Sequence, residues 1–417
     1  MTSLKNAPTE ASEAPFTGRK LKVAIAGLGM GATQIIKAME ATPYLDLMGA
    51  AEVRPESLKS FEQRFGGGHA YQNFEDLCKD PEVEAIWIST PNNLHAEQAV
   101  MAAQYGKHVV IEKPMAVSLE EAEKMVNAHE RAGTKLIAGH TASLMAGFQA
   151  MRRVITSGRI GQVRAINDWV FGDYIFRPRM PQELITELGG GVVYCLGPHS
   201  IDVVRLMGGG MVRSVRGMTG NWMPFRNGIG YYCAYLEFED GTPAMITHDG
   251  YGYFYTYEFV PWAWSGKSTF QPEAGNLRKA LRAGDAVNDA PGKEDMRFGG
   301  KDEGGMYNAK PGEVRRQTGY QPDAGIVIVS GDKGAVRQGP GGLIIYDDDG
   351  THEVPVAGIA DERIAELAEL YDAVIENRPA RHDGRWGMAT LEVVLAIMQS
   401  ARERREIFLT HQCPAWE

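Results

Sequence analysis

The first third of the chain alternates short apolar runs with segments whose apolar residues recur at helical spacing. The apolar runs predict strands at Val23–Ala26, Leu45–Ala51, Ala85–Ser89, His108–Ile111 and Leu136–Ala138. The segments between them predict helices at Ala32–Ala41, Pro55–Phe65, Leu94–Tyr105 and Leu119–Ala132. Because strands and helices alternate, we expect residues 19–141 to form a Rossmann domain, a doubly wound parallel sheet with helices on both faces.

The pattern changes after Ala142, where apolar and polar residues alternate as they do in strands that expose one face. Strands are predicted at Val163–Phe171, Tyr231–Phe238, Ala244–Asp249, Gly325–Ser330 and Leu343–Tyr346. Helices are predicted at Ala146–Thr156, Asp361–Glu376 and Gly387–Arg404. Asp240-Gly241 between two of the strands is typical of a hairpin. We therefore expect residues 142–417 to form a C-terminal α/β domain with an open, largely antiparallel sheet.

Two segments lack a regular pattern. Residues 1–18 are rich in Ala, Thr, Pro and Glu and have no apolar signal core, which predicts a disordered tail rather than a targeting peptide. Residues 265–320 are rich in Gly, Lys, Asp and Glu, which predicts a long excursion that is partly ordered at best.

Composition narrows the class of protein. A chain of 417 residues that is 44% hydrophobic is long enough for two or more domains. The net charge of −10 argues against a nucleic-acid partner, and no apolar run is long enough to span a membrane. The four cysteines are scattered, so we expect no metal site, no disulfide scaffold and a cytoplasmic location.

The first candidate binding motif is the turn after the first predicted strand, Gly27-Leu28-Gly29, where the backbone can approach a phosphate closely. Met30 and Gly31 are further candidate cofactor contacts just before the helix predicted from Ala32, whose free N–H groups point at a dinucleotide diphosphate. Glu52 closes the following strand, near the ~20-residue offset expected for the acid that holds the adenosine ribose. The order of these features predicts a nicotinamide dinucleotide site.

The same region bears on the choice of cofactor. The Glu52 carboxylate repels a 2′-phosphate, which favours NAD. Arg54, two residues further on, offers a charge that would instead accept NADP. We expect NAD and leave NADP open.

Two further motifs follow predicted strands, at the edge of the sheet where ligands bind in this architecture. The first spans Ser89–His95, in which Thr90, Pro91, Asn92 and His95 are candidate cofactor contacts; a simple Pro-Asn turn is the alternative. The second is Glu112-Lys113-Pro114, in which Glu112 and Lys113 are candidate cofactor contacts. A lysine at a buried strand end has a lowered pKa and can hold or relay a proton, although a surface Glu–Lys pair would have the same sequence.

The C-terminal half holds the remaining candidates. Cys195 and His199 share a face if their segment is helical, and histidine is a natural acceptor for a hydroxyl proton, although a core histidine fits as well. Arg177 and Arg179 suit substrate carboxylates, or belong to a solvated loop. In the predicted aromatic strand Tyr251–Tyr257, alternate tyrosines share a face, which favours a subunit interface over a pocket or core.

The motifs AGLGMGA, STPNNLH, EKP and GGG…GPHSID, in this order, resemble the Gfo/Idh/MocA oxidoreductase family over Leu21–Leu409. The resemblance implies a Rossmann domain, a C-terminal open-sheet domain and pairing through that sheet into homodimers or homotetramers. It also implies that Lys113 and His199 act at the reacting hydroxyl, with Tyr194 and Cys195 at the substrate.

The chain departs from the family pattern at two points. Cys195 stands where many sugar-oxidising members carry an aspartate, and the segment after His140 lacks the usual arginine. The segments Arg177–Leu184, Gly191–His199 and His382–Glu392 resemble a subgroup that includes phthalate 4,5-cis-dihydrodiol dehydrogenase.

We therefore expect an NAD(P)-dependent dehydrogenase that oxidises a secondary alcohol of a cyclic diol, such as a carboxylated aromatic cis-dihydrodiol. A sugar or inositol dehydrogenase, or a redox glycosidase of the same family, is the alternative within enzymes. A dinucleotide-binding regulator without turnover is the alternative outside them, and the presence of both Lys113 and His199 speaks against it.

Overall fold

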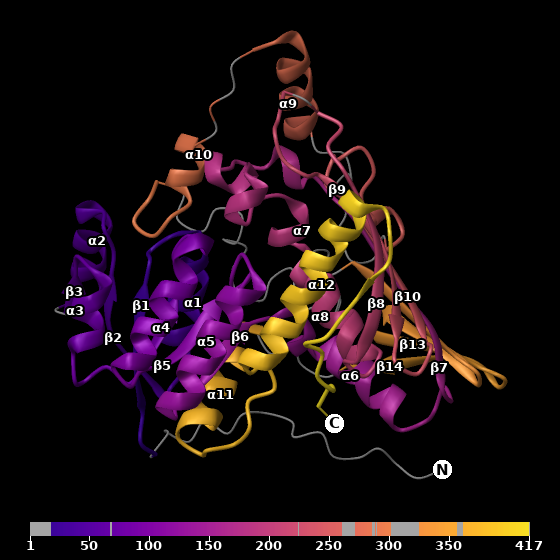
Figure 1. The fold of residues 1–417 in the computed structure, drawn as a ribbon, viewed down its shortest axis with the longest axis horizontal. Helices are drawn as coiled ribbons and strands as arrows, with labels where there is room; N and C mark the ends of the chain where they lie inside the picture. The colour runs from indigo at the N-terminus through magenta and orange to yellow at the C-terminus, as the bar shows by residue number, and fades with distance from the viewer. Residues whose placement is uncertain are drawn as a thin grey trace.

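A computed structural model describes residues 18–66, 69–223, 225–260, 272–285, 288, 290–301, 325–356 and 362–416. The chain builds two sheets, with helices between and around them (Figure 1). The predicted tail 1–18 lies outside the described residues except for its last residue. No helix in the described ranges is both long and apolar enough to cross a membrane.

The N-terminal sheet has six parallel strands in the order β3-β2-β1-β4-β5-β6, which confirms the predicted Rossmann arrangement. The strands are β1 (Leu21–Ala26), β2 (Leu45–Ala51), β3 (His69–Tyr71), β4 (Ala85–Ile88), β5 (His108–Glu112) and β6 (Leu136–Gly139). The helices are α1 (Met30–Glu40), α2 (Pro55–Phe65), α3 (Phe74–Lys79), α4 (His95–Gln104) and α5 (Leu119–Ala132). The apolar pattern missed β3 and α3 because each is too short to show a period.

Local signals explain why several helices begin and end where they do. At α5 the Ser118 hydroxyl accepts the Glu121 N–H at 3.2 Å, and Gly133 ends the helix in the left-handed conformation. Pro55 opens α2, and Gly66 closes it in the same left-handed way. The predicted bounds of both helices are confirmed for this reason.

The C-terminal sheet has nine strands in the order β14-β13-β12-β11-β7-β10-β9-β8-β15. Among the strands described, only the β7–β10 pair is parallel, which confirms an open, largely antiparallel sheet. The strands are β7 (Val163–Phe171), β8 (Val212–Gly220), β9 (Tyr231–Phe238), β10 (Pro243–Asp249), β11 (Ile326–Gly331), β12 (Gly334–Gly339), β13 (Gly342–Asp347), β14 (Gly350–Pro355) and β15 (Ile407–Phe408).

The prediction of a straight aromatic strand at Tyr251–Tyr257 is wrong. The chain bends after β10 and forms the 3-10 turn η6 (Thr256–Glu258), so the tyrosines do not line one face. Tyr251 and Tyr255 are buried, whereas Tyr253 is 64% exposed. The cause is local: the Asp249 carboxylate accepts the Tyr251 N–H at 2.8 Å, an Asx turn that ends the strand.

Helices connect the two sheets. From the middle of the chain come α6 (Ala146–Thr156), α7 (Val192–Cys195), α8 (Gly197–Met207), α9 (Pro272–Ala283) and α10 (Ala290–Asp295); from its end come α11 (Glu362–Val374) and α12 (Gly384–Glu403). α11 returns to the Rossmann sheet, where Leu367 and Leu370 join its core. α12 runs between the two halves and packs on β8, where a Cβ at Gly217 would be 2.8 Å from the Ile397 carbonyl oxygen (Figure 1).

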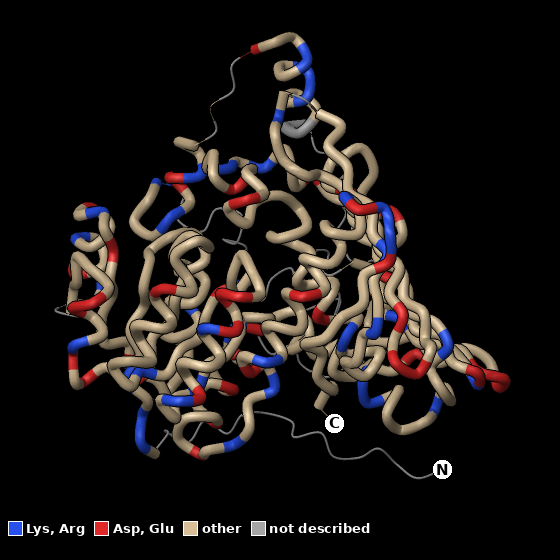
Figure 2. Tube along the Cα trace, in the orientation of Figure 1, with Lys and Arg blue, Asp and Glu red and all other residues tan. Residues whose placement is uncertain are grey.

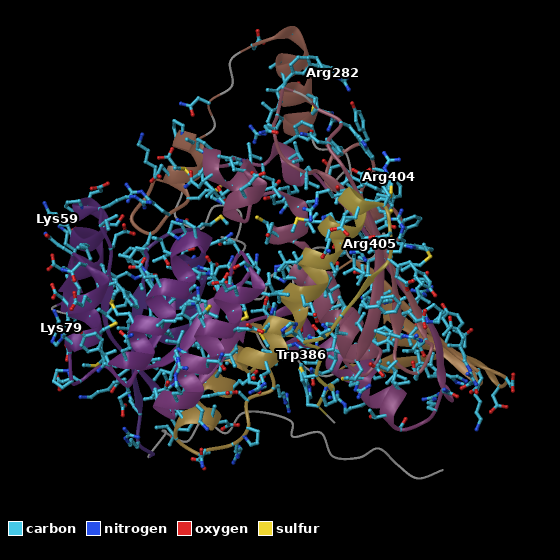
Figure 3. All side chains as sticks on the ribbon, viewed as in Figure 1. Lys59, Lys79, Arg282, Trp386, Arg404 and Arg405 are labelled. Carbon is cyan, nitrogen blue, oxygen red and sulfur yellow. The ribbon has the colours of Figure 1, made fainter. Side chains whose placement is uncertain are left out.

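Side chains and charges follow this arrangement. Trp386, at the start of α12, lies in the centre of the molecule, whereas Arg404 and Arg405 beyond its other end are exposed (Figure 3). Acidic and basic residues are interspersed over both halves (Figure 2).

α9 and α10 lie within the predicted excursion 265–320, and residues 261–271 and 302–324 lie outside the described residues.

Candidate active site

One cavity of about 510 Å³ is lined by residues from both halves of the chain. Its walls come from the loops after β1, β2, β3, β4 and β5, from the segment 174–199, and from α10 and the residue that follows it. The loops that follow the Rossmann strands lie at the carboxyl edge of that parallel sheet, where this architecture binds ligands. The predicted residues that line the cavity are Gly27, Gly29, Met30, Glu52, Arg54, Thr90, Pro91, Asn92, Lys113, Arg177, Arg179, Cys195 and His199.

The glycine turn has the geometry of a phosphate cradle. Gly27 has a φ of +86°, and a Cβ there would lie 2.8 Å from the Ser89 carbonyl oxygen, so only glycine fits. Gly29 is the N-cap of α1 and supplies no side-chain acceptor to the first turn of the helix. Gly31 does not line the cavity; it lies against Ser89, whose hydroxyl would be 2.9 Å from an added Cβ. The turn therefore leaves backbone N–H groups facing an anion site.

The acid after β2 is fixed by the backbone around it. Glu52 is 7% exposed and accepts N–H groups from Leu28 at 2.9 Å and from Arg54 at 3.1 Å. The Arg54 side chain lies 3.8 Å from the same carboxylate and 3.9 Å from Glu294. Arg54 is therefore paired with carboxylates, which weakens its case as a 2′-phosphate ligand.

The Ser89–His95 loop divides into two roles. Thr90, Pro91 and Asn92 line the cavity, and the Asn92 amide donates to the Gly189 carbonyl oxygen at 3.1 Å. His95 is fully buried outside the cavity, with its ring nitrogens 3.0 Å from the Pro114 oxygen and 2.9 Å from the Thr90 oxygen. His95 therefore holds the two loops together, in place of the cofactor contact that the sequence indicated.

Lys113 reaches into the cavity from the end of β5. Its ammonium donates to the Cys195 carbonyl oxygen at 2.8 Å, which joins the two halves of the molecule at this point. Burial lowers the pKa of Lys113. Its neighbour Glu112 faces away from the cavity and binds the Trp87 indole at 3.3 Å and Arg363 of α11 at 2.9 Å.

His199 lies in the first turn of α8 and lines the same cavity as Lys113. Burial, followed by the nearby charge of Lys113, holds the pKa of His199 well below its usual range. The imidazole is therefore neutral near physiological pH, and a neutral ring can accept a proton.

The remaining predicted substrate residues take different positions. Arg177 pairs with Asp173 at 2.8 Å. Arg179 lies over the Tyr174 ring at 3.8 Å, with Glu183 3.7 Å away. Tyr194 does not line the cavity, because its hydroxyl donates to the Val117 carbonyl oxygen at 3.1 Å.

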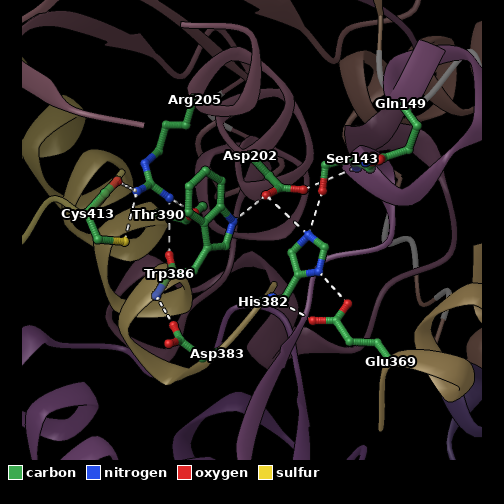
Figure 4. Close-up of polar contacts among 10 residues, drawn as sticks. All are labelled: Ser143, Gln149, Asp202, Arg205, Glu369, His382, Asp383, Trp386, Thr390 and Cys413. Atoms are coloured by element: carbon green, nitrogen blue, oxygen red, sulfur yellow. Dashed lines mark hydrogen bonds and ion pairs between the residues drawn. The ribbon is translucent and has the colours of Figure 1, made fainter. Parts of the chain in front are cut away.

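A buried polar network fixes α8 behind the cavity (Figure 4). Asp202 accepts the Trp386 indole N–H at 2.7 Å and the Ser143 backbone N–H at 3.2 Å. His382 bridges the Ser143 hydroxyl at 2.7 Å and Glu369 at 2.8 Å. Because His199 is three residues before Asp202 on the same helix, the network sets where His199 stands relative to the Rossmann sheet.

Sequence reasoning missed part of the cavity wall. Lys293 and Met296 come from the excursion, and Glu183 comes from the turn η4 (Pro181–Leu184). Lys293 Nζ lies 3.0 Å from the Glu183 carboxylate. No sequence signal marks these residues, because their segment has no regular pattern and reaches the site only through tertiary contacts.

Taken together, a Rossmann sheet, a phosphate cradle and a lysine–histidine cavity define a dinucleotide-dependent oxidoreductase. The chain matches the pattern "Oxidoreductase family, NAD-binding Rossmann fold" over residues 21–140 and "GFO/IDH/MocA C-terminal domain" over residues 148–256. It is 31% identical to 1-carboxy-3-chloro-3,4-dihydroxycyclo hexa-1,5-diene dehydrogenase of Comamonas testosteroni, over 92% of this chain and 95% of that protein. The chain therefore belongs to the Gfo/Idh/MocA oxidoreductase family, as its motifs indicated.

Other relatives agree with this assignment. The 1,5-anhydro-D-fructose reductase of Ensifer adhaerens is 39% identical over 42% of this chain, and the match spans 52% of that enzyme. A solved structure from Bordetella bronchiseptica RB50 superposes with a TM-score of 0.83 at 30% identity, covering 94% of this chain and all 100% of that one.

The cofactor of the family is NAD, and the residues present fit it. The glycine cradle and the first turn of α1 offer backbone N–H groups to a diphosphate. Glu52 stands at the end of β2, where a carboxylate can accept the ribose hydroxyls. The prediction of an NAD-dependent enzyme is thus confirmed at the level of the family.

Proposed function

We propose that this chain oxidises a secondary alcohol of a cyclic diol that carries a carboxylate, with Lys113 and His199 as the catalytic residues. The observation that supports this most is the shared cavity, which holds both side chains beside the dinucleotide cradle. When bound, the nicotinamide supplies the acceptor for the hydride that leaves the substrate carbon.

The proton is handled by the chain itself. His199 is held neutral by burial and by Lys113, so its ring can take the proton from the substrate hydroxyl. Lys113 is anchored to the Cys195 carbonyl oxygen and has further N–H groups for the oxygen that develops negative charge. The two groups therefore act on the same oxygen from opposite halves of the molecule.

Two features support a carboxylated diol over a sugar. Cys195 brings a thiol to the cavity where sugar-oxidising relatives carry a carboxylate, so an anionic substrate meets less repulsion. Arg177 and Arg179 line the same cavity, where a substrate carboxylate would have to share their guanidiniums with Asp173 and Glu183. The Comamonas relative acts on a carboxylated dihydroxycyclohexadiene, as its name states.

A panel of substrates tests the proposal through NADH absorbance. The panel pairs a carboxylated cis-dihydrodiol with the same diol lacking the carboxylate, and adds myo-inositol, glucose and a 1,5-anhydro sugar. We expect the highest kcat/KM for the carboxylated diol and a rise in KM of about tenfold or more without the carboxylate. Preferred turnover of inositol or a sugar would refute the substrate class while leaving the dehydrogenase role intact.

We further propose that the chain forms a homodimer or homotetramer through its C-terminal sheet. Large apolar side chains are exposed on four neighbouring strands: Trp169 (37%), Met218 (52%), Tyr235 (41%) and Met245 (49%). An apolar face of this kind on a soluble protein indicates an interface.

The mass in solution tests this assembly. In size-exclusion chromatography with light scattering, M218E/M245E should elute as a smaller species than the unchanged protein. The control is Lys59→Glu, at the outer edge of the Rossmann half, which should not change the mass (Figure 3). A monomer in the unchanged protein would contradict the proposal.

A further inference from the structure

The segment 290–300 packs on the dinucleotide-binding half, although it follows β10 of the C-terminal sheet in the chain (Figure 1). Phe298 is 1% exposed and packs beside the paired rings of Phe61 and Phe65, at centroid distances of 6.0 and 6.4 Å. Arg297 pairs with Glu56 at 3.1 Å and also bonds the Ser57 hydroxyl. The segment is therefore docked on α2 by apolar and ionic contacts together.

The same segment is bonded to the glycine turn itself. The Phe298 N–H donates to the Leu28 carbonyl oxygen at 3.2 Å, and Leu28 is the middle residue of that turn. Glu294 lies 3.9 Å from Arg54, next to the acid that ends β2. The segment thus passes over the mouth of the cofactor cradle.

Lys293 is the residue of the segment 290–300 whose ammonium approaches the start of α1. Its side chain is 12% exposed, and Nζ lies 3.8 Å from the sulfur of Met30, the first residue of α1. The carboxylate of Glu183 is 3.0 Å away. Glu183 offsets the cost of burying this ammonium, and because both groups line the cavity, the ammonium is also placed where an anionic ligand can reach it.

We propose that Lys293 is a ligand of the cofactor diphosphate, brought by the segment 290–300 to the first residue of α1. A dinucleotide on the glycine turn brings its diphosphate to Met30, within reach of an ammonium already in contact with that residue. Glu183 holds the ammonium in place until the anion arrives. The proposal rests on the family's cofactor and not on the identity of the diol.

Calorimetric titration of the full chain with ADP-ribose and with AMP tests this role. ADP-ribose carries the diphosphate, whereas AMP carries the adenosine and one phosphate only. We expect Lys293→Met to weaken ADP-ribose binding about tenfold and to change AMP binding less than twofold, because one charge-assisted bond to the diphosphate is lost. Lys293→Arg should recover part of the affinity.

Lys279→Met is the matched control, because Lys279 is an exposed lysine of the same excursion and should leave both affinities unchanged. Unchanged ADP-ribose binding in Lys293→Met would overturn the proposal. So would a rise in KM for a carboxylated diol without loss of ADP-ribose affinity, which would assign Lys293 to the substrate. Failure to oxidise any diol would affect only the proposed function, since these titrations need no turnover.

Discussion

Lys113 and His199 show how burial prepares two ionisable side chains for opposite tasks. Burial lowers the pKa of both groups, and the charge of Lys113 lowers that of His199 further. The Lys113 ammonium donates to the Cys195 carbonyl oxygen. The His199 ring is neutral, so one of its nitrogens can accept a proton. A strand end and a helix end therefore bring a donor and an acceptor to one cavity.

Lys113→Met is expected to lower kcat by about 10²- to 10⁴-fold, the usual contribution of a positioned proton-handling group. NAD affinity, measured by titration, should change much less. Lys107→Met is the matched control, because Lys107 is a buried lysine outside the cavity, bonded to the carbonyl oxygens of Asp80 at 2.6 Å and Val83 at 2.7 Å. It should lower stability and leave kcat unchanged; full turnover in Lys113→Met would contradict the assigned role.

The pH profile of kcat/KM reports on His199. Because its pKa lies well below the usual range, the accepting form persists into acid, and activity should hold below about pH 6.5, where an ordinary histidine is protonated. The residual activity of His199→Asn should lack this acid limb. A limb centred at or above pH 6.5 in the unchanged enzyme would show that the ring is not held neutral.

Among the elements, α8 depends most on its neighbours. It is fixed through Asp202 to Trp386 of α12 and to Ser143 after β6, and His382 and Glu369 complete the network. Burial lowers the pKa of His382, but the carboxylates of Glu369 and Asp202 outweigh it, so the net pKa is raised. The carboxylates of Glu369 and Asp202 therefore favour the protonated form of His382 in the folded protein.

A raised pKa makes stability depend on pH in a defined direction. The stabilisation from His382 is fully present below its unfolded pKa of about 6.5 and is lost as pH rises through its higher folded pKa. The free energy of unfolding, measured with urea, should therefore fall from neutral to alkaline pH. His382→Gln should remove this slope and cost about 3–5 kcal/mol at neutral pH, because it leaves Glu369 buried without its partner.

His129→Gln provides the control for this slope. Burial lowers the pKa of His129 to about 4, so its ring is neutral throughout the range tested. The variant should lower stability without changing the alkaline slope. If the free energy of unfolding of His382→Gln falls with pH as it does in the unchanged protein, groups other than His382 cause the fall.

In the whole molecule, the cavity is complete only where three parts of the chain meet. The Rossmann loops supply the cradle, the segment 174–199 supplies the acceptor, and α10 adds a cation. A ligand that contacts all three should stabilise the folded chain as a unit, because it binds the native state and not the unfolded one.

NAD at one hundred times its Kd should add about 2.7 kcal/mol to the free energy of unfolding and raise Tm by several degrees. NADP at the same concentration should raise Tm less, because the buried Glu52 carboxylate opposes a 2′-phosphate. Differential scanning fluorimetry measures both shifts. A larger shift with NADP would reverse the expected preference and assign Arg54 to the phosphate.

For Lys113 and His199 the residues alone left open a surface Glu–Lys pair and a core histidine, and the expected roles came from the family resemblance. The local pattern was sufficient for most of the Rossmann sheet and for the glycine turn after β1. Each depends on short-range features: a strand that runs into glycine, or a helix whose period is visible over eleven residues or more, as in α1 and α5. The aromatic segment after β10 failed because one Asx turn, made by Asp249, overrode the alternating pattern.

What required the tertiary structure were the contacts between segments far apart in the chain. His95 and Tyr194 have the chemistry of ligands, yet backbone carbonyls occupy their polar atoms, including those of Pro114 and Val117 after β5. Lys293 carries no local signal and reaches the cradle only because Phe298 docks on α2. Short-range periodicity specifies which elements form, whereas burial and long-range pairing decide which polar side chains are left to face a ligand.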